Sequence, residues 1–153
     1  MAERITIDRA RPDEAEWCAA VMADTDPWVT LGRTYEASLV RLKREGSELF
    51  VARRGDVRLG FILMDRYGVA GSPYIASVAC TAEARGRGIG SALLEFAERL
   101  YPDARHIFLC VSSFNAEARR LYERRGYTLT GTLKDYAIDG ADEFLMTKRL
   151  DAR

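Results

Sequence analysis

The sequence predicts a mixed α/β domain, and three observations support this fold class. Apolar runs typical of strands alternate along the 153 residues with segments whose apolar side chains recur at helical spacing. The stretch Arg-Arg-Gly-Asp at residues 53–56 separates two such runs and predicts a β-hairpin. A glycine-rich turn at residues 85–90 joins a further apolar run to an amphipathic helix. The expected element order is β-α-α-β-β-β-α-β-α-β-β.

The first half of the chain carries three strand signals and two helix signals. Residues 4–8 alternate polar and apolar side chains, as a half-buried strand does. Asp13, followed by Glu16 three residues later, is typical of a helix start, and Gly46 is typical of a helix end. The expected elements are a strand over residues 4–8, a helix from Asp13 to a break at residues 24–28, a helix over 34–45, and strands over 49–52 and 57–64.

The second half begins with a flexible loop and then alternates strands with helices. Six apolar residues between Ile89 and Leu100 share one helix face. Asn115 suits the N-cap of a following helix, and Gly126 suits its end. The expected elements are a loop over residues 68–73, strands over 74–80 and 106–111, helices over 89–100 and 116–125, and strands over 127–133 and 143–148.

The composition of the chain argues against some classes of binding partner. The 23 basic and 23 acidic residues balance, so we expect no general attraction to nucleic acid or to an anionic membrane. No apolar run approaches the roughly 20 residues of a membrane span, and residues 1–4 lack the apolar core of a signal peptide. We therefore expect a cytoplasmic protein. Three dispersed cysteines, Cys18, Cys80 and Cys110, and the single His106 predict no disulfide framework and no metal site.

The turn at residues 85–90, Arg-Gly-Arg-Gly-Ile-Gly, has the properties of a phosphate site. The first N–H groups of a helix have no acceptor in the chain, and the helix dipole adds partial positive charge there. Glycines allow an anion to approach closely, and the two arginines supply full charges. The alternative is a glycine-rich helix start whose arginines are merely solvated. Neither the P-loop pattern nor the dinucleotide pattern Gly-x-Gly-x-x-Gly fits this turn.

A third pattern, Arg/Gln-x-x-Gly-x-Gly/Ala, is met by Arg85, Gly88 and Gly90. It resembles the pyrophosphate loop of the GNAT (GCN5-related) N-acetyltransferases, which bind acetyl-CoA. A second stretch resembles another acetyl-CoA motif of that family, Asn-x-x-Ala-x-x-Leu-Tyr-x-x-x-Gly-Phe/Tyr. Its matching residues are Asn115, Ala118, Leu121, Tyr122, Gly126 and Tyr127.

This resemblance implies a fold and a donor site. The fold would be one GNAT domain over residues 1–153, with a mixed, mostly antiparallel central sheet, two splayed parallel strands and flanking helices. The splayed strands would end at Cys80 and Val111, with the pantetheine arm between them and one N–H polarising the thioester carbonyl. The implied acetyl-CoA-binding residues are Val78, Ala79, Cys80, Arg85, Gly86, Arg87, Gly88, Ile89, Gly90, Ser91, Asn115 and Tyr122.

Several of these residues have a simpler interpretation as well. Val78 and Ala79 would in any case be core strand residues, and Asn115 would in any case cap a helix. In the family, the tyrosine matching Tyr122 protonates the departing thiolate, but helical spacing alone would also suit a core aromatic residue. The resemblance favours the catalytic role for Tyr122.

The proton acceptor and the amine substrate are less well defined. N-terminal acetyltransferases of the ribosomal-protein type carry a glutamate base where this chain has Cys110, so Asp65, Glu36 or a water chain remain as alternatives. Trp28, Tyr67 and Tyr136, in segments expected to be loops, are candidates for the acceptor pocket; they could equally cover the core edge or form a dimer contact.

The expected activity is direct transfer of an acetyl group from acetyl-CoA to a primary amine. A small-molecule amine is favoured, and a lysine side chain or a peptide N-terminus is the alternative acceptor. A silent acyl-CoA-binding regulator and an enzyme for longer acyl chains are further alternatives. The resemblance also makes a homodimer plausible.

Overall fold

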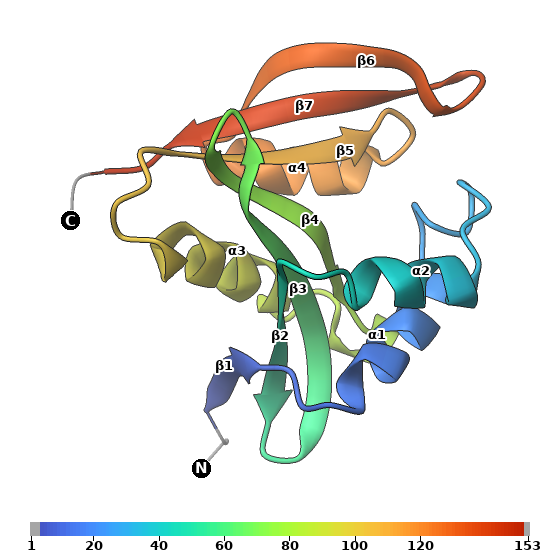
Figure 1. The fold of residues 1–153 in the computed structure, drawn as a ribbon, viewed down its shortest axis with the longest axis vertical. Coiled ribbons are helices and arrows are strands. Elements are labelled where there is room, and N and C mark those ends of the chain that lie inside the picture. The colour runs from blue at the N-terminus through green and yellow to red at the C-terminus, as the bar shows by residue number, and fades with distance from the viewer. Residues whose placement is uncertain (1–3, 152–153) are drawn as a thin grey trace.

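The computed structural model describes residues 4–151, which form one seven-stranded sheet with helices on both faces (Figure 1). The strand order is β1-β2-β3-β4-β5-β7-β6, and only β4 and β5 pair in parallel. The prediction of a mixed, mostly antiparallel α/β sheet is confirmed. The elements are β1 (Ile5–Arg9), α1 (Glu14–Ala23), α2 (Tyr35–Leu42), β2 (Ser47–Arg54), β3 (Val57–Val69), β4 (Ser72–Cys80), the short 3-10 helix η1 (Ala82–Ala84), α3 (Ile89–Leu100), β5 (His106–Ser112), α4 (Ala116–Arg124), β6 (Thr128–Ile138) and β7 (Ala141–Arg149).

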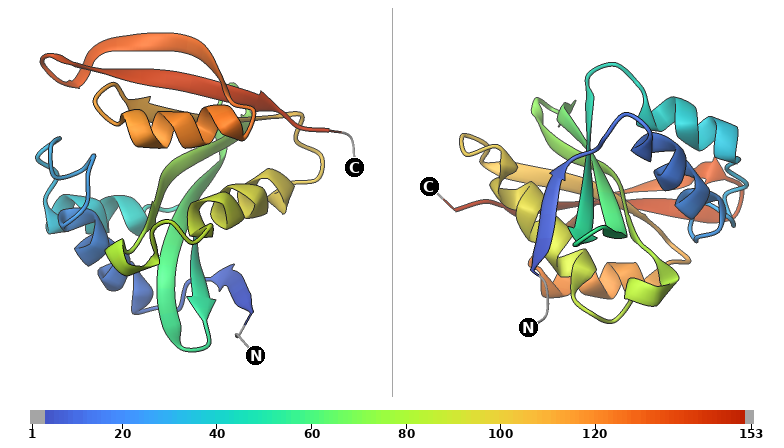
Figure 2. Two further views of the ribbon diagram at one scale, coloured as in Figure 1. Left: turned by 180° about the vertical axis from the view of Figure 1, so that it is seen from behind. Right: turned by 90° about the horizontal axis from the view of Figure 1, so that it is seen from below.

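The sheet separates two apolar clusters, because alternate strand residues point to opposite faces. On β3, Ile62 and Met64 join the cluster beneath α3 and α4, whereas Phe61 and Leu63 join the cluster beneath α1 and α2. All four of these side chains are almost completely buried. Figure 2 shows the two helical layers from behind and from below. Burial on both faces explains why β2 and β3 have nearly continuous apolar sequences.

Several boundaries differ from the predictions by a few residues, and three differences have a clear structural reason. The segment expected as a loop at residues 68–73 is mostly strand, because Val69 pairs with Ser72 across a tight hairpin. Strand β6 continues to Ile138, through a segment expected to be a loop, because β7 supplies it with a partner. At the start of α1 the Asp13 side chain makes no cap; the Glu14 carboxylate instead accepts the Arg11 N–H at 2.8 Å.

Strands β4 and β5 separate soon after they meet. Their pairing is limited to Tyr74 with Phe108 and Ile75 with Leu109. The register between β3 and β4 shifts at the next residue of β4, Ala76, and such a bulge bends a strand. The bend carries the end of β4 away from β5, so the splayed parallel strands expected from the family resemblance are present.

Other expectations concern membranes and metals. Residues 1–3, on which the expectation about a signal peptide partly rests, lie outside the described part of the chain. No helix within residues 4–151 has the length and apolar character needed to cross a bilayer. The same residues contain no group of three or more His, Cys, Asp or Glu side chains placed to hold a metal ion.

Candidate active site

A cleft of about 730 Å³ occupies the gap between β4 and β5. Its walls come from β4, the 85–91 turn, β5 and α4, and it extends to the α1–α2 connection and the β6–β7 hairpin. Arg87 and Tyr67 are the predicted site residues that do not line it. The predicted residues that do line it are Trp28, Val78, Ala79, Cys80, Arg85, Gly86, Gly88, Ile89, Gly90, Ser91, Asn115, Tyr122 and Tyr136.

One end of the cleft lies at the start of α3. Gly88 occupies the N-cap with φ of +80°, a left-handed conformation that favours glycine. The first helical hydrogen bond runs from the Ala92 N–H to the Gly88 carbonyl at 3.0 Å. The N–H groups of residues 89–91 therefore have no acceptor within the helix, and they lie at the end of the helix where its dipole is positive. This geometry suits a phosphate group.

The free edge of β4 forms one wall next to this helix start. The Thr81 N–H donates to the Leu59 carbonyl at 2.9 Å, so Thr81 faces β3. Because strand residues alternate in direction, the main-chain groups of Ala79 also face β3, and those of Val78 and Cys80 face the gap. Of the three predicted strand residues, Ala79 therefore lines the cleft without offering its main-chain groups to it.

Helix α4 brings Asn115 and Tyr122 to the opposite wall. The Asn115 side chain accepts the Ala118 N–H at 3.4 Å, so it caps the helix while lining the cleft. Tyr122 follows two turns later, 8% exposed, with its ring edge-on to Tyr127. No side chain within residues 4–151 forms a hydrogen bond with its hydroxyl. Burial raises the pKa of Tyr122 to about 12, so this phenol keeps its proton at neutral pH.

At the far end of the cleft, polar side chains come together from three strands. The Tyr74 side chain on β4 lies beside the Cys110 thiol on β5. Burial raises the pKa of the Cys110 thiol, so Cys110 is a neutral thiol rather than a thiolate. Ser112 on β5 donates to Glu143 Oε2 on β7 at 2.5 Å. This leaves Glu143 Oε1 without a hydrogen-bond partner within residues 4–151.

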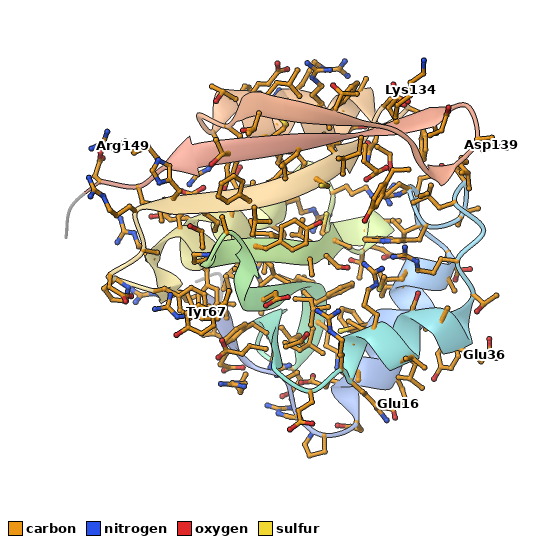
Figure 3. The ribbon with its side chains drawn as sticks, turned by 45° about the horizontal axis from the view of Figure 1, so that its top comes forward. Glu16, Glu36, Tyr67, Lys134, Asp139 and Arg149 are labelled. Atoms are coloured by element: carbon orange, nitrogen blue, oxygen red, sulfur yellow. The ribbon has the colours of Figure 1, made fainter. Side chains whose placement is uncertain are left out.

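The two named candidates for the proton acceptor lie outside the cleft. Asp65 forms an ion pair with Arg44 at 3.1 Å. Glu36 is exposed on the outer side of α2 (Figure 3). Glu143 was missed because its position depends on the pairing of β5 with β7, which no local pattern reveals.

The three aromatic candidates for the acceptor pocket lie in different places. Trp28 is buried, and Tyr136 is exposed on β6 rather than in a loop; both line the cleft. Tyr67 lies on β3, across the molecule from Glu36 (Figure 3), where its ring stacks with Arg66. The hairpin that carries Tyr67 points away from the cleft, so Tyr67 has no part in it.

Comparisons with known proteins identify the family that the chain resembles. The family model described as the acetyltransferase (GNAT) family matches residues 9–127. An uncharacterized N-acetyltransferase of Methanocaldococcus jannaschii is 42% identical over 82 residues, covering 52% of this chain and 53% of the relative. An N-alpha-acetyltransferase of Saccharolobus solfataricus is 34% identical over 80 residues, covering 50% of this chain and 48% of the relative. The chain thus matches about half the length of these curated relatives.

The fold has close structural counterparts as well. The crystal structure of Ard1 from Thermoplasma volcanium superposes with a TM-score of 0.78 at 25% sequence identity. The superposition covers 96% of this chain and 98% of the other. The splayed sheet is therefore shared over nearly the whole chain.

Proposed function

Because this chain belongs to the acetyltransferase (GNAT) family, we propose that it is an acetyl-CoA-dependent N-acetyltransferase acting on a primary amine. The observation that carries the proposal is the cleft between β4 and β5, which runs from the start of α3 past Tyr122 to Glu143. We take residues 1–153 as a single acetyltransferase domain.

The donor would bind along one side of the cleft. The N–H groups of residues 89–91, together with the Arg85 side chain, would hold the pyrophosphate of acetyl-CoA. The main-chain groups of Val78 and Cys80 would pair with the amides of the pantetheine arm, as an added strand pairs with a sheet edge. One of these N–H groups would also stabilise the oxyanion that forms at the thioester carbonyl.

Transfer would proceed in one direct step. The amine nitrogen attacks the acetyl carbonyl carbon, a C–N bond forms, and the C–S bond to coenzyme A breaks. The Tyr122 hydroxyl gives its proton to the departing sulfur, which its raised pKa allows at neutral pH. The proton lost by the amine passes to Glu143, directly or through water, because Glu143 is the carboxylate beside Tyr74 and Cys110 in the cleft.

We favour a small-molecule amine as acceptor. The α1–α2 connection contributes Trp28 and Arg33 to the acceptor end, and the β6–β7 hairpin contributes Tyr136. These segments give that end side-chain walls suited to a compact substrate. A peptide N-terminus is the second candidate, favoured by the name of the Saccharolobus solfataricus relative, an N-alpha-acetyltransferase.

The proposal is tested by following the release of free coenzyme A with a thiol-reactive dye. Acetyl-CoA is supplied with a panel of small amines, lysine peptides and peptides with free N-termini, and succinyl-CoA and longer acyl-CoA donors are compared. We expect thiol release that depends on the amine and is fastest with acetyl-CoA. If acetyl-CoA binds but no amine releases thiol, the chain is an acyl-CoA-binding module and not an enzyme.

A further inference from the structure

Two arginines line the acceptor end of the cleft without a carboxylate partner. Arg33 lies in the connection between α1 and α2, and Arg41 lies on α2. Arg33 is partly buried, whereas Arg41 is exposed at the rim. Neither guanidinium forms an ion pair or a side-chain hydrogen bond with another residue within 4–151. Both positive charges are therefore left to face the cleft.

Three partly buried arginines elsewhere in the molecule are paired with carboxylates. Arg58 contacts Glu14 at 2.9 Å, Arg66 contacts Asp103 at 2.8 Å, and Arg125 contacts Glu98 at 2.8 Å. Such pairing is expected, because removing a charge from water is costly unless an opposite charge compensates. Arg33 and Arg54 are partly buried without such a partner within residues 4–151, but only Arg33 of the two lines the cleft, where a bound anion could compensate its charge.

The local electrostatics also indicate that an anion would be stabilised there. Burial lowers the pKa of Arg33, and the like charge of Arg41 lowers it further. Glu143 and Tyr74 partly offset this by raising the pKa. Two positive charges are thus held near one another at the edge of a low-dielectric cleft. An anion bound between them would relieve their repulsion and form charge-assisted hydrogen bonds.

The same end of the cleft contains a negative charge on another wall. Glu143 projects from β7 and is oriented by Ser112, with one carboxylate oxygen left available. The acceptor end therefore offers a carboxylate for an amino group and two guanidiniums for an acidic group.

We propose that the acceptor is an amine that also carries a carboxylate or a phosphate, bound with its acidic group on Arg33 and Arg41 and its amino group toward Glu143. This inference rests on the proposed acetyltransferase function and narrows its substrate class. Arg33 and Arg41 are then residues that determine specificity, and the acetyl-CoA end of the cleft does not depend on them.

The test compares amines that differ only in the acidic group. β-Alanine is compared with propylamine, and phosphoethanolamine with ethanolamine, by thiol release at saturating acetyl-CoA. We expect kcat/KM for the better anionic amine to exceed that of its neutral counterpart at least about tenfold, the factor expected for one or two charge-assisted hydrogen bonds. The pair with the larger ratio identifies the acidic group.

Variants then connect the preference to the two arginines. Arg33→Gln and Arg41→Gln should each lower kcat/KM for the anionic amine about tenfold. kcat/KM for the neutral amine should fall much less than kcat/KM for the anionic amine. The KM for acetyl-CoA should change little, which shows that the variants fold. Arg33→Lys should retain part of the preference through its charge. The control is Arg44→Gln, which removes an arginine just beyond α2 that pairs with Asp65 outside the cleft and should leave the preference intact.

The possible outcomes separate this inference from the function on which it rests. Neutral amines accepted as well as anionic ones would overturn the inference and leave the acetyltransferase function standing. A raised KM for acetyl-CoA in Arg33→Gln would also overturn it, because the arginine would then belong to the donor site. Absence of thiol release with every amine would overturn both.

Discussion

The two ends of the cleft are built in different ways. The donor end is formed mostly by main-chain groups from one stretch of chain, the end of β4 and the turn into α3. The acceptor end is formed by side chains from segments far apart in the sequence, among them Arg33, Tyr74 and Glu143. In the proposed function, main-chain groups would recognise the parts that every acetyl-CoA molecule shares, and the side chains of the acceptor end could change without disturbing these groups. The construction thus allows acceptor specificity to vary while donor binding is retained.

Different interactions hold the two ends of the cleft in place. The donor end rests on close backbone packing: a Cβ added at Gly60 on β3 would lie 2.6 Å from the Ala79 carbonyl oxygen. The acceptor end includes the connection between α1 and α2, and α1 is held to the sheet by a buried ion pair. Glu14 is completely buried at the start of α1 and contacts Arg53 on β2 at 2.5 Å and Arg58 on β3 at 2.9 Å.

The largest expected effect follows from breaking this ion pair. Glu14→Gln leaves the buried Arg53 with only the exposed carboxylate of Asp8 as its ion-pair partner, at 3.3 Å. We expect the free energy of unfolding to fall by about 3 kcal/mol, the low end of the range for removing one partner of a buried pair. Urea denaturation at pH 7 measures it. The control is Glu16→Gln, which removes a surface partner of Lys43 and should cost far less.

The effect of Glu14 should depend on pH in a defined direction. Burial alone would raise the pKa of Glu14, but the Arg11 N–H and the charges of Arg58 and Arg53 outweigh burial and hold the pKa below 4.5. A carboxylate with a lowered pKa stabilises the fold above its unfolded pKa and loses this contribution as the pH falls. The difference between wild type and Glu14→Gln should therefore shrink below about pH 4.5; a constant difference would contradict the ion-pair role.

The second-largest expected effect concerns Tyr122, which lies between the donor end and the acceptor end of the cleft. Tyr122→Phe removes the proposed general acid while keeping the ring, and we expect kcat to fall about 100-fold, the low end for general acid catalysis. KM for acetyl-CoA should change little. Because the pKa of Tyr122 is raised to about 12, wild-type kcat should show no loss from this group up to about pH 10.

A neighbouring tyrosine provides the matched control. Tyr127→Phe removes a hydroxyl that donates to Glu98 at 3.1 Å, away from the cleft, so it should cost about 1 kcal/mol of stability and leave kcat unchanged. Equal activity of Tyr122→Phe and wild type, under conditions where chemistry limits the rate, would remove Tyr122 from the mechanism.

The sequence predicted the local structure of the proposed donor end, the helix that follows the glycine-rich turn and the cap at Asn115, because this structure depends on short stretches of chain. The left-handed conformation of Gly88 and the cap at Asn115 are consequences of a few adjacent residues, and a short pattern captures them. The element order was predictable for the same reason, since hydrophobic periodicity is a property of short windows. Where tertiary pairing decides, as in the extension of β6 to Ile138, the prediction was wrong.

The residues of the acceptor end could be predicted only in part. Trp28 was a predicted candidate for the acceptor pocket, and it lines the cleft together with Arg33 from the same connection. No local sequence pattern singles out Arg33, because arginines are common in polar connections and the sequence does not show whether an arginine has an ion-pair partner. Glu143 depends likewise on the register of β5 with β7. Tyr67, a candidate because it is an aromatic residue in an expected loop, lies on β3 and does not line the cleft.

The smallest effect tests whether the donor end is a built site or only a positively charged surface. Arg85 and Arg87 are both exposed, two residues apart in the same turn, but only Arg85 lines the cleft. We expect Arg85→Ala to raise the KM for acetyl-CoA about tenfold through the loss of a charge-assisted hydrogen bond, and Arg87→Ala to raise it less than about threefold. The amine KM should not change in either variant. If the two variants were equally impaired, and the impairment vanished at high salt, long-range attraction would explain donor binding without a specific contact. In that case the contrast between the two ends would rest on the main-chain N–H groups of residues 89–91 alone.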